Sequence, residues 1–443
     1  MKIPAIKGFD EEAFQKYFKN TGWLMFGKVM SLLITIIVAR YLKPKSFGDL
    51  NFAAALTTIV AAIGALGLDS FIIREIIHDS SKKDEILGTS LWLRIGVNLV
   101  LLPLSIGAYL LFHHFSRNPG NPLTWIVFFY AVPGVFKSFN IIDSYFQSQV
   151  QSKYVVHVQN IGVIVSTVMK IMLVWLNAPL IWFAAVITFD AAFLATGLVL
   201  MYHRQGFKLR TWSFNFDRAK MLLKQSYPLM FSAAMVSIYM KIDAVMLKSV
   251  GSTAVGIYSA AAGLSEAWFF IPMAIVTSVF PAIINARKTD VERYNKRLIN
   301  LYDLLVYISL PVAIFVSFFG SEIIHIIYGN QYEGAGQMLS IHIWSGVFVF
   351  LGIASGQYLV TEGYTNISFQ RTAMGALINI LLNLWLIPVY GGIGTSIATL
   401  IAYFISTFYI LLIPKTRKQG ILMLKSLFLI HLFEKITARG ATR

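Results

Sequence analysis

Seven lysine and arginine side chains lie inside long apolar runs of this sequence. They are Lys28, Arg40, Arg94, Lys137, Lys170, Lys241 and Arg371. An ionised side chain at bilayer depth costs about 3 kcal/mol or more unless it faces water or a partner. Seven such residues therefore predict a polar interior, and buried cations of this kind are suited to charge-assisted hydrogen bonds with an anion such as phosphate.

Lys28 belongs to a polar stripe on the first apolar run. Lys28, Ser31 and Thr35 are spaced i, i+3 and i+7, so they share one face of a helix while the opposite face can meet lipid. This polar face is predicted to line a cavity. Arg40 and Arg371 lie near the ends of their runs, where a long side chain can instead snorkel to the headgroups.

The other buried cations have a structural alternative to ligand binding. Arg94, Lys137 and Lys170 can pair with acids on neighbouring helices. Lys241 and Asp243 are two residues apart, about 200° around a helix, so they do not form a local ion pair. The candidate binding cations are Lys28, Arg94, Lys137, Lys170, Lys241 and Arg371.

Four acids inside the apolar runs are candidates for reversible ion binding. They are Glu266, Asp143, Asp190 and Asp243. A carboxylate in a partly desolvated cavity can bind and release a proton, and protonation removes a negative charge that competes with a ligand for the cations. The alternative for Glu266 is a structural ion pair with a buried lysine.

Covalent chemistry has no signature in this sequence. Cysteine is absent, which excludes thiolate metal sites and Cys nucleophiles. No H-E-x-x-H, Walker-type G-x-x-x-x-G-K-[ST] or G-x-S-x-G pattern occurs, so metal-dependent hydrolysis, ATP use and a hydrolase elbow are without support. We expect no enzyme, no catalytic residues and no metal site.

The elements that must position these side chains are membrane-spanning helices. Of the 443 residues, 57% are apolar and 13% are charged, and the mean hydropathy is +0.67. Soluble domains carry about a quarter charged residues, so this composition indicates a chain that faces lipid. Twelve spans are expected at 22–42, 48–68, 88–112, 123–147, 154–176, 179–202, 226–247, 255–284, 298–319, 337–360, 366–388 and 391–413.

The basic residues predict the orientation of these spans. The chain has a net charge of +16, which in a soluble protein would suggest nucleic acid as a partner. Here, 26 of the 30 lysines and arginines outside the spans fall in segments that are cytoplasmic if the N-terminus is inside. This bias predicts cytoplasmic termini and explains most of the charge without a nucleic-acid partner.

Two sequence echoes suggest an internal duplication. LMF at 24–26 recurs at 229–231, and GDLNFAAAL at 48–56 resembles GIYSAAAGL at 256–264. Parallel repeats of this kind place a cavity between two lobes. The expected division is a cytoplasmic N-terminus with an amphipathic start, an N-terminal six-helix lobe, a basic cytoplasmic connection, a C-terminal six-helix lobe and a basic tail with an interfacial helix over 421–433, at 1–21, 22–202, 203–225, 226–413 and 414–443.

Four stretches resemble a known family. They are MFGKV at 25–29, VARYL at 38–42, IYGNQYEGA at 327–335 and LNLWLIPVYGGIG at 382–394. The sequence is similar to the bacterial polysaccharide or O-antigen flippases, in the superfamily that also contains multidrug and toxin extrusion antiporters. The resemblance covers residues 14–413 and implies an all-α membrane protein with about twelve helices in two six-helix bundles around a central cationic cavity.

The resemblance implies a transporter of an undecaprenyl-diphosphate-linked oligosaccharide, such as an O-antigen or other surface polysaccharide repeat unit. Transport by alternating access, from the cytoplasmic to the periplasmic leaflet of the bacterial inner membrane, would be coupled to H+ or Na+ and need no other cofactor. Membrane lipids and other polysaccharide-assembly proteins are the further expected partners. A family arginine that contacts the diphosphate falls at Lys28, and a required family acid falls near Glu266, whereas two family arginines are replaced by Ile34 and Gly263.

Two other functions remain open at this point. A multidrug or cation antiporter of the same fold would need acids facing an organic cation, yet cations outnumber acids in these spans. A membrane glycan polymerase or ligase would be expected to carry a large outer loop with catalytic residues. The longest outer loop predicted here is the short segment 320–336, which contains no lysine or arginine.

Overall fold

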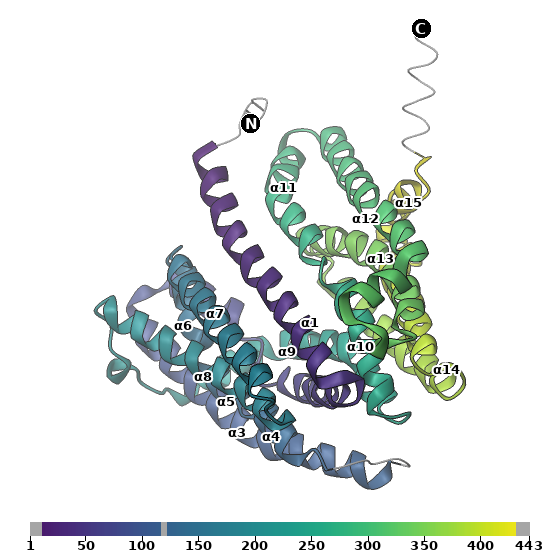
Figure 1. Ribbon diagram of the computed structural model, residues 1–443. Coiled ribbons are helices and arrows are strands. Elements are labelled where there is room, and N and C mark those ends of the chain that lie inside the picture. The colour runs from purple at the N-terminus through teal and green to yellow at the C-terminus, as the bar shows by residue number, and fades with distance from the viewer. Residues whose placement is uncertain (1–10, 117–121, 431–443) are drawn as a thin grey trace. The chain divides into compact units, whose positions relative to one another are not determined.

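A computed structural model describes residues 11–116 and 122–430 of the chain, with the backbone alone for 11–26, 288 and 289. The described residues form α-helices and short 3-10 turns, and no β-strand occurs among them. Figure 1 shows these helices coloured from purple at the N-terminus to yellow at the C-terminus. The predicted all-α membrane fold is confirmed.

The chain divides into two compact units. The first comprises residues 1–42 and 56–234, and the second comprises residues 43–55 and 235–443. The division falls within helix α9 (Phe216–Leu247) rather than in the predicted connection 203–225. A second difference from the predicted lobes is the short segment 43–55, which belongs to the second unit although both of its flanks belong to the first.

Helix α1 (Glu11–Ala61) contains the first predicted span and most of the second. It is broken at Lys43, which has φ 61° and ψ 167°, immediately before Pro44. Proline disfavours the helical conformation of the residue before it and offers no backbone N–H, so the helical hydrogen bonds are interrupted there. The sharp turn between the predicted spans follows from this pair of residues.

The remaining helices of the first unit surround an apolar core. They are α2 (Asp69–His78), α3 (Lys83–Phe115), α4 (Thr124–Ala131), α5 (Pro133–Lys137), α6 (Ile141–Ser148), α7 (Lys153–Trp175) and α8 (Leu180–Arg204). Pro133 begins α5, where a missing N–H costs little. The fourth predicted span is therefore a chain of three short helices. Ile72, Phe146 and Tyr202 are fully buried in the core of this unit.

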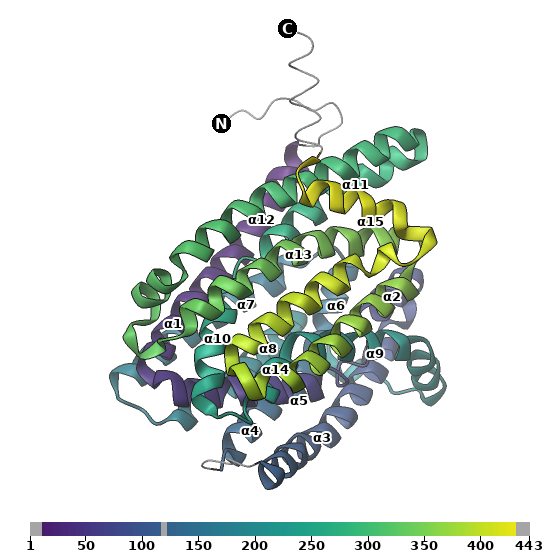
Figure 2. The same cartoon turned by 90° about the vertical axis from the view of Figure 1, so that its right-hand side faces the viewer.

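Besides segment 43–55, the second unit contains the end of α9 and six more helices. They are α10 (Ser252–Glu266), α11 (Phe270–Thr289), α12 (Val291–Tyr328), α13 (Ala335–Thr361), α14 (Thr365–Phe408) and α15 (Pro414–Leu427). Helix α14 is broken at Gly391, whose φ of 54° suits glycine. Helix α13 packs between α12 and α14, as Figure 2 shows.

Nine helical segments in the described residues are long and apolar enough to cross a membrane. One of them, Thr365–Leu411, contains two predicted spans on either side of Gly391. Helix α1 is not among the nine, and it contains the first predicted span and most of the second on either side of the break at Lys43. The twelve predicted spans therefore fall largely on helical segments, although the second continues past Ala61 and the fourth consists of three short helices. The number nine is lower because α1 is not counted and because Thr365–Leu411 is counted once.

The predicted basic connection 203–225 packs closely against the first unit. A Cβ on Gly88 would collide with the backbone of Ser213. The Thr89 hydroxyl accepts a hydrogen bond from the backbone N–H of Asn215 at 3.0 Å. Arg218 forms an ion pair with Glu85, with Nε 2.7 Å from Oε1. This segment is held in place by backbone and side-chain contacts.

The C-terminal amphipathic element also differs from its predicted position. Its helix begins at Pro414 rather than at 421, and the predicted range continues into residues 431–433, which lie outside the described part. Helix α15 packs on α12 within the second unit. Met423 is fully buried there, and the Gln419 amide contacts the Tyr302 hydroxyl. Its inner face therefore carries polar as well as apolar contacts.

Candidate substrate cavity and ion-binding cluster

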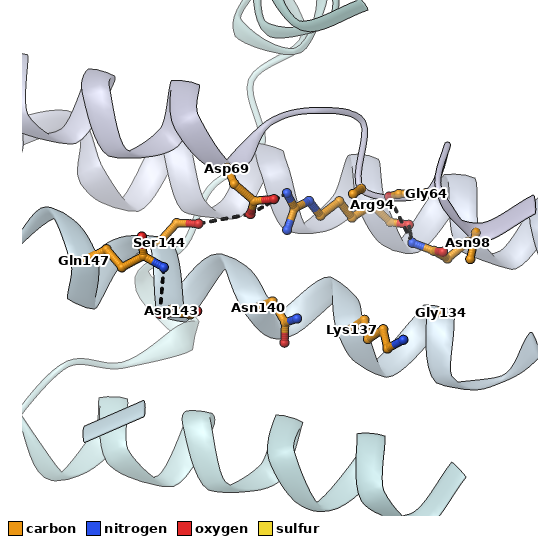
Figure 3. Close-up of a pocket in the computed structure, with 12 residues that line it drawn as sticks. Gly64, Asp69, Arg94, Asn98, Gly134, Lys137, Asn140, Asp143, Ser144 and Gln147 are labelled. Carbon is orange, nitrogen blue, oxygen red and sulfur yellow. Dashed lines mark hydrogen bonds and ion pairs between the residues drawn. The ribbon is translucent and has the colours of Figure 1, made fainter. Parts of the chain in front are cut away.

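A cavity of about 410 Å³ lies within the first unit. Its walls come from the end of α1, the start of α2, the middle of α3 and the short helices α5 and α6. Polar side chains dominate the lining, as Figure 3 shows. They are Asp69, Arg94, Asn98, Lys137, Asn140, Asp143, Ser144 and Gln147.

Arg94 is the buried cation of this cavity. Its Nη2 donates to Asp69 Oδ1 at 2.8 Å, and the Ser144 hydroxyl donates to the same oxygen at 3.1 Å. The Arg94 side chain is only 3% exposed, whereas that of Asp69 is 54% exposed. The pair therefore lies at the boundary between the protein interior and the open cavity, and Asp69 neutralises the buried guanidinium.

Asn98 positions the deep wall of the cavity. Its amide Nδ2 donates to the backbone oxygen of Arg94 at 2.8 Å and to that of Gly64 at 3.2 Å. A Cβ on Gly64 would collide with this amide, and a Cβ on Gly134 would lie 2.8 Å from its Oδ1. The two glycines let the turn after α1 and the start of α5 approach the asparagine closely.

Lys137, Asn140 and Asp143 line the cavity along α5 and α6 at i, i+3 and i+6, with Asn140 between the two charges in Figure 3. Asp143 Oδ1 accepts a hydrogen bond from the Gln147 amide at 3.1 Å. Lys137 is exposed in the cavity and has no hydrogen-bond or ion-pair partner among the described residues. Because Asp69 already pairs with Arg94, Lys137 is the cation that the cavity offers to an anionic ligand.

A second polar cluster surrounds Asp243 inside the second unit. Asp243 is 4% exposed and accepts hydrogen bonds from the Tyr258 hydroxyl at 2.8 Å, the Asn383 amide at 2.6 Å and the Thr399 hydroxyl at 2.6 Å. These donors come from α10 and from both halves of α14. Each of them is neutral, and no lysine or arginine of the described residues forms an ion pair with Asp243.

The groups around Asp243 have the chemistry of an ion-binding site. A buried carboxylate without a counter-charge is costly, so a proton or a bound cation would stabilise it. The Asn383 Oδ1 atom is buried without a hydrogen-bond partner among the described residues. It offers a further oxygen beside the carboxylate, and hard cations such as Na+ prefer oxygen ligands of this type.

Glu266 lies in a different environment from Asp243. Its Oε2 is 3.7 Å from Lys241 Nζ, and both side chains are partly exposed, at 26% and 39%. Lys241 thus pairs with Glu266 and not with Asp243, two residues away. This ion pair is the structural alternative that the sequence left open for Glu266. His342 is buried nearby, and its Nδ1 lies 3.0 Å from the Ser265 hydroxyl.

The other predicted residues lie apart from these two sites. Lys28, Ser31 and Thr35 are exposed on α1, and the Thr35 hydroxyl donates to the Ser31 carbonyl at 2.7 Å. They belong to the first unit but do not line the cavity of Figure 3. Lys170 pairs with Asp190, with Nζ 3.5 Å from Oδ2.

Arg371 is held within the second unit. Its Nη2 donates to the backbone oxygen of Gly352 at 3.0 Å. Its Nε and Nη1 atoms are buried without a hydrogen-bond partner among the described residues. Arg371 therefore contacts the backbone of α13, and the predicted snorkelling to headgroups is not the arrangement seen here.

Sequence reasoning missed the neutral members of both sites. Asn98, Asn140 and Ser144 in the first unit carry no charge and stand in apolar runs that favoured attention to lysine and arginine. Asn383 and Thr399 of the second unit had a detectable signal. Each repeats at i, i+4 with Asn379 and Thr395, which places polar groups on one face of an apolar helix.

Two family models match the sequence of this chain. The model for the polysaccharide biosynthesis protein family matches residues 16–287, and a model described as MatE matches residues 228–385. The first match covers more than half of the chain. The chain belongs to the polysaccharide biosynthesis protein family. The predicted resemblance to polysaccharide flippases of the superfamily shared with multidrug extrusion proteins is confirmed.

Individual relatives extend this family assignment. The chain is 20% identical over 406 residues to a capsular polysaccharide biosynthesis protein, CapF, of Staphylococcus aureus, which covers 88% of this chain and 96% of CapF. An uncharacterized membrane protein of Methanocaldococcus jannaschii is 31% identical over 112 residues, which is 25% of this chain and 22% of that protein. The chain thus spans about a fifth of this second relative.

A solved structure shares the fold. The lipid II flippase MurJ in an inward closed conformation superposes with a TM-score of 0.72 at 16% identity, covering 94% of this chain and 93% of MurJ. At this identity the likeness establishes the fold and not the substrate. Together, the family and the fold show a multi-pass membrane protein of the polysaccharide biosynthesis protein family.

Proposed function

We propose that this protein moves an undecaprenyl-diphosphate-linked oligosaccharide from the cytoplasmic to the outer leaflet of a bacterial inner membrane, by alternating access and without covalent chemistry. The observation that carries this proposal is Lys137, a cation inside a polar cavity that no acid of the described residues neutralises. The printed roles of CapF and MurJ, in capsular polysaccharide biosynthesis and lipid II flipping, support the substrate class.

The charge distribution of the cavity favours one orientation of the ligand. A diphosphate would bind toward Lys137, because Asp143 repels an anion at the other end. Asn140 and Gln147 present amides that both donate and accept hydrogen bonds, which suits sugar hydroxyls. Arg94 acts as a positioning residue in this arrangement, since Asp69 already engages its guanidinium.

Lys28 supplies a second cation on the same unit. Its exposed side chain lies on the polar face of α1, and it occupies the place of a family arginine. In our proposal Lys28 makes the first contact with the diphosphate, and Lys137 holds it within the cavity. The apolar prenyl tail stays in the lipid and needs no polar lining from the protein.

Transport would be coupled to H+ or Na+ through Asp243. Its carboxylate is buried among three neutral donors, whereas Glu266 is already compensated by Lys241. A group that gains and loses a proton or a cation changes the local charge by one unit. Such a change shifts the equilibrium between two conformations only when the surrounding groups compensate the charge of the site poorly in one of them.

The proposed orientation, with both termini inside, places 26 of the 30 lysines and arginines outside the spans on the cytoplasmic side, as the positive-inside rule favours. Further partners of the same proposal are the surrounding membrane lipids and other proteins of polysaccharide assembly. Glycan chemistry itself would be carried out by those other proteins. This chain would recognise and move the lipid-linked product.

The test is a flipping assay in proteoliposomes with undecaprenyl-diphosphate-linked oligosaccharide. A hydrogen bond to a charged group contributes about 1.5–3 kcal/mol, so Lys137→Gln should lower flipping by roughly 10- to 100-fold. Lys137→Arg should retain part of the activity. The matched control is Lys220→Gln, because Lys220 is exposed on α9 outside the cavity. Equal flipping by Lys137→Gln and the control would refute the proposal.

A multidrug antiporter is the second candidate function, and the MatE match at residues 228–385 favours it. Efflux of an organic cation such as ethidium from the same proteoliposomes separates the two functions. Gradient-driven ethidium efflux without flipping of the oligosaccharide would select the antiporter.

A further inference from the structure

A second cavity, of about 540 Å³, lies within the second unit where α12 ends and α13 begins. Half of its lining residues come from the IYGNQYEGA stretch at 327–335, which the proposed transport site does not use. Its volume falls within the range of roughly 300–1,000 Å³ that is usual for small-molecule sites. The cavity is therefore large enough to take a ligand of its own.

Buried aromatic rings support the wall of this cavity. Tyr328 and Tyr332 are 2% and 0% exposed, and their ring centroids lie 5.1 Å apart. Phe47 packs edge-to-face on Tyr332, with ring centroids 6.3 Å apart. Gly329 and Gly334 adopt φ 83° and 86°, which suits glycine and turns the chain sharply between the two helices. The rings and the two turns together fix the backbone of the lining.

Four polar side chains of the lining are exposed and unpaired. They are His325, Asn330, Glu333 and Gln337, and none of these side chains makes a hydrogen bond or an ion pair with another of the described residues. The two amides and a neutral imidazole each donate and accept hydrogen bonds, whereas the carboxylate accepts them. A sugar hydroxyl also donates and accepts, so this set of groups matches a ligand that carries several hydroxyls.

The charges around the cavity disfavour other classes of ligand. Lysine and arginine are absent from residues 320–336 and from the described lining, so an anion would meet the Glu333 carboxylate without a compensating cation. Divalent cations such as Ca²⁺ need several oxygen ligands. No group of three His, Cys, Asp or Glu side chains that could hold a metal occurs in the part of the chain that the structure describes. These observations favour a neutral ligand.

We propose that this cavity is a sugar-binding site, in which His325, Asn330, Glu333 and Gln337 bind the hydroxyl or amide groups of a sugar residue without an acidic group. In the proposed orientation, segment 320–336 lies on the outer side of the membrane. The site then holds a sugar of the delivered oligosaccharide or of a free glycan outside the cell. The side and the source of the sugar rest on the proposed function, whereas sugar binding itself does not.

The test is the binding of free sugars to the full chain in lipid nanodiscs, because maltoside detergents are themselves sugars. The neutral probes are glucose, galactose, rhamnose, N-acetylglucosamine and N-acetylgalactosamine, and the anionic control is glucuronate. Saturation-transfer difference NMR measures each affinity. We expect saturable binding of at least one neutral probe and weaker binding of glucuronate. Failure of every neutral probe to bind, or tightest binding of glucuronate, would overturn the proposal.

Matched variants assign the binding to this cavity. Glu333→Ala removes the carboxylate of the lining, and Gln337→Leu replaces an amide with an apolar side chain of similar size. Each should lower the affinity about tenfold or more, because a sugar hydroxyl loses its hydrogen-bond partner. The control is Glu322→Ala, which removes an exposed acid of α12 outside the lining and should leave the affinity unchanged. Unchanged affinity in both cavity variants would place sugar binding elsewhere and refute the site.

A single cysteine distinguishes the two sources of sugar. Ser321 lines the cavity, and the chain has no other cysteine, so Ser321→Cys reports on occupancy through its rate of labelling by a maleimide. Slower labelling with undecaprenyl-diphosphate-linked oligosaccharide in the nanodisc, but not with the free oligosaccharide, would identify the delivered substrate. The reverse would identify a soluble glycan. Equal rates with both ligands and with neither would contradict the site.

These readouts separate the sugar site from the proposed transport. If oligosaccharide is not flipped but a neutral sugar binds and loses affinity in Glu333→Ala, the transport proposal fails and the sugar site stands. If oligosaccharide is flipped but no neutral probe binds, the sugar site is overturned and the transport proposal stands.

Discussion

The Arg94 guanidinium and the Asp69 carboxylate form an ion pair across the wall of the first-unit cavity, with Nη2 2.8 Å from Oδ1. The arginine is buried, and the aspartate is half-exposed. Because Arg94 is the more deeply buried of the two, its charge depends more on the ion pair for stabilisation than the charge of Asp69 does. Removal of Asp69 would leave a cation inside an apolar wall, whereas removal of Arg94 would leave an acid that water can still reach.

The first prediction follows from this asymmetry. Asp69→Asn should lower the free energy of unfolding by about 1–3 kcal/mol, because an unpaired buried charge pays its desolvation penalty. Arg94→Met, which removes the buried charge, should cost less, and the double variant should be no less stable than Asp69→Asn alone. Thermal unfolding of the purified protein in detergent measures all three. A larger loss for Arg94→Met than for Asp69→Asn would contradict the assignment.

Lys28 provides the second prediction. Its ammonium is exposed on α1 and has no ion-pair partner among the described residues, so its removal should not destabilise the fold. Lys28→Ala should abolish flipping at normal expression, while Lys28→Arg, which keeps the charge, should retain some. The measurement is the proteoliposome assay beside a melting curve. Normal flipping by Lys28→Ala would remove Lys28 from the substrate path.

The third prediction compares the two candidate coupling acids. Asp243→Asn should make flipping insensitive to an imposed H+ or Na+ gradient, because the amide cannot exchange a proton and binds cations weakly. Glu266→Gln should keep its gradient dependence, since Glu266 pairs with Lys241. Proteoliposomes with each gradient imposed separately identify the ion. Loss of coupling in the Glu266 variant alone would reverse the assignment.

The fourth prediction concerns topology. Single cysteines at positions 117 and 208 of this cysteine-free chain should label from opposite sides, with position 117 accessible from outside. Position 117 lies outside the described residues, so the charge bias alone carries this expectation. An impermeant maleimide applied to intact cells and to inverted vesicles provides the comparison. Labelling of both positions from the cytoplasm would refute the twelve-span orientation.

Much of the fold was predictable from the sequence because the membrane constrains a chain strongly. A long apolar run must form a helix that satisfies its own backbone hydrogen bonds, so the predicted spans fall on helices. Pro44 and Gly391 likewise mark breaks that a local rule anticipates, since proline and glycine act on the backbone of their neighbours. Composition alone also required that buried cations meet polar groups.

Which partner each charge would meet was not predictable, because ion pairs join residues far apart in the chain. Lys241 stands two residues from Asp243 but pairs with Glu266 on another helix, and Asp243 meets Asn383 and Thr399 from α14. Periodicity defines a face of a helix but not the neighbour that covers it.

By itself, the sequence determined a membrane protein of helical spans, rich in buried cations, with both termini expected in the cytoplasm. Tertiary structure alone decided that Arg94 pairs with Asp69 while Lys137 lines the same cavity without an ion-pair partner among the described residues. It also decided that Asp49, in the segment 43–55, contacts Lys248 and Ser252. The physical reason is common to both cases. The energy of a buried charge depends on the few groups within about 4 Å of it, and long-range packing selects those groups.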